Sequence, residues 1–148
     1  MNHQELYKKY NTPERSIKHM KKVAHLSEVI ADMTDLKINK HLLINSALLH
    51  DLVKNPTNPN NDFERVWSHQ EQVRKILKKE KHPLTADTAS RHNTHGLTRE
   101  ESLEWGHPTG INLTPKSNES RIIAFADGLR KEYKIGRASC RERVYTKV

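Results

Sequence analysis

The chain has 148 residues, a length typical of one domain, and a formal net charge of +8 from 26 lysines and arginines against 18 aspartates and glutamates. Hydrophobic residues make up 34% of it, and no apolar run approaches the ~20 residues of a membrane-spanning helix. With no apolar signal segment and one cysteine, we expect a cytoplasmic protein without internal disulfides or a cysteine-based zinc site.

In chain order, the sequence predicts helices separated by short loops. Thr12 and Pro13 form a helix start, and apolar residues then recur at helical spacing to about residue 33. Further helices are predicted over residues 39–53, over a segment ended by Pro83, and over residues 85–92, 98–106 and 117–134. Asn- and Pro-rich residues 55–61 and residues 108–115 read as loops. No segment alternates with a period of two, so the predicted fold class is all-α, a compact bundle of about five to seven helices.

The last part of the chain is unlike the rest. Residues 135–148 are basic and contain Cys140, and their first ten residues resemble the translation of a common sequencing adaptor. We therefore take residues 1–134 as the domain and expect residues 135–148 to be non-native. The alternative is a basic, disordered native terminus. An uninterrupted native reading frame across the codon for Ile135 would contradict the adaptor interpretation.

Histidine is abundant, with 10 residues, and several of them lie where core residues are expected. His50 and Asp51 end an apolar run, and Asp127 lies among apolar residues. His19 and His69 lie on the inward-facing stripes of their predicted helices, and His92 lies near Ala89 on a partly inward face. Buried polar groups need partners, and imidazole with carboxylate suits Fe, Mn, Co, Ni or Zn. Helices that each bring one ligand inward predict a metal site in the bundle core.

The order of these residues resembles the HD superfamily of metal-dependent phosphohydrolases, in particular its small single-domain members. The resemblance covers about residues 5–134 and rests on His19, the pair His50-Asp51 and the late Asp127, with His69 and His92 between them. It implies that His19, His50, Asp51 and Asp127 hold one divalent metal. Asp51, His69 and His92 would hold a second, with His95 able to replace or supplement His92.

The resemblance also implies a reaction. A metal-bound hydroxide would cleave a phosphoester or phosphoanhydride bond of a nucleotide or another small phosphate. Asp51 would be central to catalysis as the ligand of both ions. Lys54 follows the His-Asp pair, and Arg15 lies one helical turn before His19, so both are expected to contact the substrate phosphate. If either His69 or His92 is not a ligand, the site holds one ion.

Two alternatives remain open at this point. One is a di-iron oxygenase of the same family, since its ligand set overlaps this one. The other is a non-catalytic module that uses the basic run 74–81 to bind nucleic acid or a partner; nucleic acid is less favoured because no aromatic residues interleave the run. Trp67 and Trp105 are expected to pack. The remaining histidines are expected on the surface: His3, His25, His41, His82 and His107.

Overall fold

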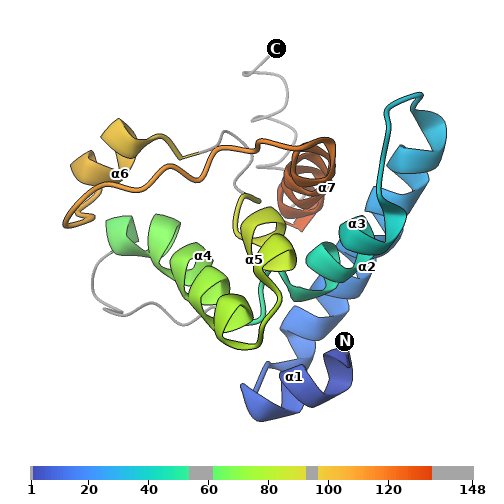
Figure 1. Cartoon of the computed structure of the whole chain (residues 1–148), viewed down its shortest axis with the longest axis horizontal. Coiled ribbons are helices and arrows are strands. Elements are labelled where there is room, and N and C mark those ends of the chain that lie inside the picture. Colours follow the sequence, from blue (N-terminus) through green and yellow to red (C-terminus); the bar gives the residue numbers. More distant parts are fainter. Residues whose placement is uncertain (1, 54–61, 93–96, 135–148) are drawn as a thin grey trace.

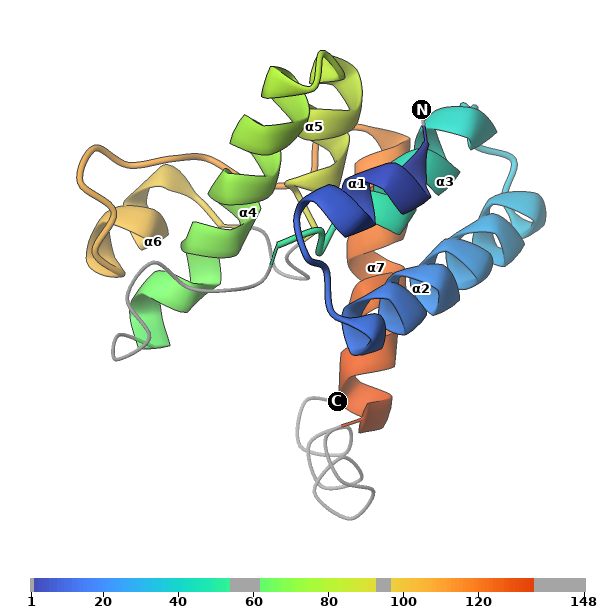
Figure 2. The ribbon, with the colours of Figure 1, turned by 90° about the horizontal axis from the view of Figure 1, so that it is seen from below.

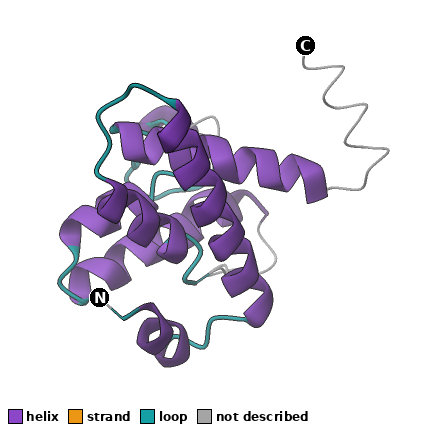
Figure 3. Ribbon diagram, turned by 90° about the vertical axis from the view of Figure 1, so that its right-hand side faces the viewer, coloured by secondary structure: helices purple, strands orange, loops and turns teal. Residues whose placement is uncertain are grey.

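The computed structural model describes residues 2–53, 62–92 and 97–134, and within these ranges all regular structure is helical (Figures 1 and 3). The predicted all-α fold is therefore confirmed. The seven helices of the described residues are α1 (His3–Lys9), α2 (Glu14–Met33), α3 (Lys40–Leu49), α4 (Asp62–Lys79), α5 (Pro83–Ala89), α6 (Arg99–Glu104) and α7 (Asn118–Lys134). No described helix has the length and apolar character to cross a membrane.

Side-chain caps begin several of these helices. The Asn39 side chain accepts a hydrogen bond from the Leu42 amide at the start of α3, and Thr98 forms a reciprocal capping box with Glu101 at the start of α6. Asn2 caps α1, a helix that was not among those predicted from the sequence. Its seven residues are too short to show a periodic pattern, and burial of Leu6 and Tyr7 holds it in place.

Two helix ends differ from prediction, and both matter for the site. α3 ends at Leu49, not at residue 53, so His50 caps the helix and Asp51 lies in the following turn. α5 begins at Pro83 and ends at Ala89, so His92 follows the helix instead of lying in it. Pro83 occupies the first turn of α5, where its missing N–H costs nothing.

Two hydrophobic clusters form the interior. The α2–α3–α7 core contains the buried side chains Val23, Ala24, Ala31, Leu43, Ala47, Ile122, Ile123 and Ala126. The α4–α5 core joins those two helices to α1, to the start of α2 and to the end of α3, through Leu6, Tyr7, Met20, Leu49, Leu52, Val73, Leu77, Ala86 and Ala89.

The two cores meet along α2 and at the end of α3. Figure 2 shows α4 and α5 to the left of α2 and α3, with α7 crossing α2 in the centre. His19 precedes Met20 of the α4–α5 core, and Asp127 follows Ala126 of the α2–α3–α7 core. The predicted ligands therefore come from both sides of this boundary.

Candidate metal centre

Four of the six predicted ligands meet at what we call the first metal position, defined by His19, His50, Asp51 and Asp127. The His19 Nε2 atom is 2.8 Å from Asp127 Oδ1 and 3.6 Å from Asp51 Oδ2. The His50 Nε2 atom is 3.4 Å from each of the same two oxygens. All four residues are buried, and they come from α2, the end of α3 and α7.

The other two predicted ligands lie on the opposite side of Asp51, at what we call the second metal position, defined by Asp51, His69 and His92. Asp51 Oδ1 is 3.6 Å from His69 Nε2 and 3.4 Å from His92 Nε2. The two histidine Nε2 atoms are 3.1 Å apart. The Asp51 carboxylate therefore directs one oxygen to each position and is the residue common to both.

These spacings match those of ligands around a cation. Nitrogen and oxygen ligands lie about 2.0–2.2 Å from a transition metal, so neighbouring ligands at angles of 90–110° are about 2.9–3.5 Å apart. The contacts given above, from 2.8 to 3.6 Å, fall in or next to this range. In addition, buried His50 Nε2 has no hydrogen-bond partner among the described residues, as expected of an atom whose partner is a metal. The residues present fit a metal at each position.

Local backbone contacts fix two of the imidazole rings. His50 Nδ1 is 2.6 Å from the Ala47 carbonyl oxygen, and His92 Nδ1 is 2.8 Å from the Ala89 carbonyl oxygen. A carbonyl oxygen only accepts, so each Nδ1 carries the proton and donates it. In the neutral rings, each Nε2 then presents its lone pair to the site, which is the state that a metal ligand needs.

The electrostatics of the cluster favour cations. Burial acts to lower the pKa of His50, but the carboxylates of Asp51 and Asp127 outweigh it and raise the pKa to about 10. Burial acts in the opposite sense on the two carboxyls, yet their histidine neighbours hold the pKa of Asp51 and of Asp127 well below the usual range. Both carboxylates are therefore ionised at neutral pH and bring two negative charges into a buried site.

One prediction about the other histidines is wrong. His107 was expected on the surface, but it is buried, and its Nδ1 accepts hydrogen bonds from the Thr109 and Gly110 amides. Its Nε2 donates to Glu71 of α4 at 3.0 Å, and its ring packs edge-on against Trp67. His107 lies between Gly106 and Pro108, where no helical periodicity in the sequence indicates which side chains are buried. His107 thus fixes the chain after α6 to the helix that carries His69.

Of the two residues predicted to contact phosphate, Arg15 alone lies within the described residues. Arg15 is exposed in the first turn of α2, one turn before His19. Lys54 lies outside the described residues, as does His95. As expected, Trp67 packs, and its indole N–H donates to the Trp105 carbonyl oxygen.

Comparison with known proteins agrees with this geometry. The family model described as "HD domain" matches residues 16–131, which includes all six residues of the two metal positions. No solved structure matches the chain closely enough to be counted as similar. Because the match spans most of the chain and the histidine and aspartate side chains converge as described, this protein belongs to the HD domain family, a superfamily of metal-dependent phosphohydrolases.

Proposed function

We propose that the protein is a dinuclear metal-dependent phosphohydrolase that cleaves a phosphoester or phosphoanhydride bond of a nucleotide or another small phosphate. The observation that carries the proposal is the division of the Asp51 carboxylate, with Oδ2 toward His19 and His50 and Oδ1 toward His69 and His92. This arrangement supports two cations held side by side. Such a pair activates water and neutralises the negative charge of a phosphate and its leaving oxygen.

The protein's own residues have distinct tasks in this proposal. Asp51 would hold the separation of the two ions, and the Nδ1 contacts of His50 and His92 would keep both rings oriented. Exposed Arg15 would contact the substrate phosphate from the first turn of α2. Lys54, which follows the His-Asp pair in sequence, would contact the same phosphate. The metals are expected among Fe, Mn, Co, Ni and Zn, given nitrogen and carboxylate ligands.

The first test compares wild type with Asp51→Asn. The wild-type chain, purified anaerobically, should carry about two metal equivalents and hydrolyse part of a panel of nucleotides and phosphate esters. Asp51→Asn should lose both metals and reduce turnover by at least about 100-fold, since a ligand common to both positions is lost. The matched control is His25→Gln, an exposed histidine of the same helix as His19.

The outcomes separate the competing functions. Full turnover by Asp51→Asn would contradict the proposal. Oxygen uptake by the ferrous protein with no hydrolysis would favour the oxygenase. Salt-sensitive nucleic-acid binding that persists in chelator, without hydrolysis, would favour the binding module.

Arg15 allows a narrower test of the same proposal. Arg15→Gln should raise KM for the phosphate substrate about tenfold and leave the metal content unchanged, because the residue would contact substrate and not metal. Steady-state kinetics beside metal analysis would check this. An unchanged KM would remove Arg15 from the substrate site without affecting the metal proposal.

A further inference from the structure

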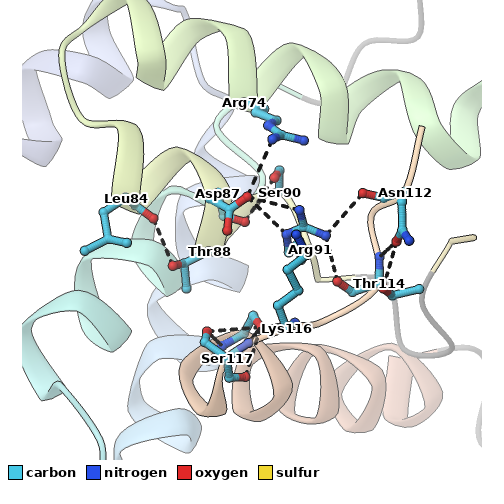
Figure 4. Close-up of polar contacts among 11 residues, drawn as sticks. Arg74, Leu84, Asp87, Thr88, Ser90, Arg91, Asn112, Thr114, Lys116 and Ser117 are labelled. Atoms are coloured by element: carbon cyan, nitrogen blue, oxygen red, sulfur yellow. Dashed lines mark hydrogen bonds and ion pairs between the residues drawn. The ribbon is translucent and has the colours of Figure 1, made fainter. Parts of the chain in front are cut away.

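Arg91 is a charged side chain enclosed by protein immediately before the ligand His92. Its side chain is 3% exposed, and all three guanidinium nitrogens have partners (Figure 4). Nη1 donates to the carbonyl oxygens of Asn112 and Thr114, at 3.1 and 2.8 Å. Nε and Nη2 lie 3.2 and 3.1 Å from Asp87 Oδ1. An arginine buried with this many bonds is held in one conformation.

These contacts join two parts of the chain that are far apart in sequence. Asp87 lies in α5, whereas residues 112–114 belong to the connection that leads into α7, which carries Asp127. Figure 1 shows this connection running from α6 past α5 to α7. A backbone hydrogen bond from Leu113 N to Leu97 O, at 2.7 Å, adds a second link to the same connection. Arg91 therefore ties the end of α5 to the approach of α7.

The tie matters because the two metal positions draw ligands from different helices. His19, His50 and Asp127 come from α2, the end of α3 and α7, whereas His69 comes from α4 and His92 follows α5. The second position thus depends on where α4 and α5 lie relative to Asp51. A shift of about 1 Å at His92 would separate its Nε2 from the range of metal–ligand distances.

We propose that Arg91 is a positioning residue for the second metal position: by binding Asp87 and the carbonyl oxygens of Asn112 and Thr114, it holds His92 where its Nε2 meets Asp51 and His69. This inference rests on the proposed dinuclear function. Arg91 itself contacts neither metal nor substrate and acts through the position of His92. Asp87 Oδ1 is shared by two guanidinium groups, those of Arg91 and Arg74, at 3.1 and 3.6 Å.

The experiment measures the two metal affinities separately. Mn²⁺ is titrated into the chelator-treated full chain in competition with an indicator, with electron paramagnetic resonance to detect the paired ions. Arg91→Ala should weaken the second Mn²⁺ by about 10–100-fold, the range for residues that orient metal ligands, and change the first by less than about threefold. Arg91→Lys keeps the charge but not the fork of donors, so the second affinity should fall by an intermediate factor.

The control is Arg99→Ala, because Arg99 also donates to this connection, through the Thr109 carbonyl oxygen, but is exposed and does not adjoin a ligand. It should leave both affinities unchanged. If Arg91→Ala does not fold, Arg91→Lys carries the test. Equal weakening of both Mn²⁺ affinities, or of neither, would overturn the role of Arg91. A wild-type chain that binds one Mn²⁺ would instead overturn the dinuclear function on which the inference rests.

Discussion

His50 and His92 show how a local feature can orient a metal ligand. Each follows the last residues of a helix, and each donates its Nδ1 proton to the carbonyl oxygen three residues earlier. The last carbonyl groups of a helix lack helical partners, so they are available for such a bond. The ring is thereby fixed before any metal binds, and Nε2 points into the site. At the scale of single residues, the helix end supplies the orientation that a ligand requires.

The raised pKa of His50 predicts how the metal-free protein responds to alkali. Its folded pKa, about 10, exceeds its ordinary value of 6.5, so its contribution to stability is complete below pH 6.5 and is lost as the pH rises through 10. Urea denaturation of the chelated protein should therefore show a loss of about 3–4 kcal/mol between pH 6.5 and 9.5. His50→Gln should lack this decline. The same decline in wild type and variant would contradict the assignment to His50.

At the scale of elements, α3 connects the two cores. Leu43 and Ala47 pack against α2 and α7, while Leu49 at its end belongs to the α4–α5 core. Its N-terminus is fixed by the Asn39 cap, and its C-terminus by His50. A short helix that is buried on several sides receives its stability from packing more than from its own hydrogen bonds. The position of the His50-Asp51 pair therefore depends on the fit of α3 between its neighbours.

Truncation of Leu43 tests this dependence. Leu43 is fully buried, so Leu43→Ala should lower the free energy of unfolding by about 2–5 kcal/mol through lost burial and the cavity left behind. The matched control is Leu84→Ala in α5, where the side chain is 62% exposed and the cost should stay below about 0.5 kcal/mol. Chemical denaturation of both variants gives the comparison. Equal costs would show that α3 does not depend on this contact.

The turn after α6 contains two glycines with different surroundings. Both have a positive φ, +93° at Gly106 and +81° at Gly110, so alanine should cost about 1–2 kcal/mol at either. A Cβ at Gly110 would also lie 2.7 Å from Arg99 Cγ, whereas nothing lies within 4 Å of one at Gly106. Gly110→Ala should therefore cost about 1–3 kcal/mol more than Gly106→Ala in urea denaturation. An equal cost would mean that Arg99 moves away freely.

At the scale of the whole molecule, the ligands join the two cores. The first metal position draws on α2, α3 and α7, and the second adds α4 and the residues after α5. Without cations, two carboxylates and four imidazoles remain together in a buried space, which is costly unless protons or metals balance their charges. Metal binding should therefore stabilise the whole domain and not one helix alone.

Metal removal tests this expectation by calorimetry. With free metal 100-fold above its Kd, one bound ion stabilises the folded state by about 2.7 kcal/mol, so chelation should lower Tm by about 5–15 °C. Re-addition of metal should restore Tm. Asp51→Asn should show no such response, and His25→Gln should respond as wild type does. A wild-type Tm that ignores chelator would contradict a metal centre between the cores.

The sequence by itself determined the fold class and the six candidate ligands, because helical periodicity and a polar residue in an apolar stripe are local patterns. His19, His69 and Asp127 could be identified in this way from their own helices. Only the tertiary structure decided that Asp51 directs one oxygen to each ligand set, that His107 is buried against Glu71, and that Arg91 links α5 to the approach of α7. The contacts of the first metal position join residues up to 108 positions apart, His19 and Asp127, and depend on how the helices pack. Local sequence patterns do not specify which distant side chains come into contact. The two metal positions therefore form only when the helices pack together.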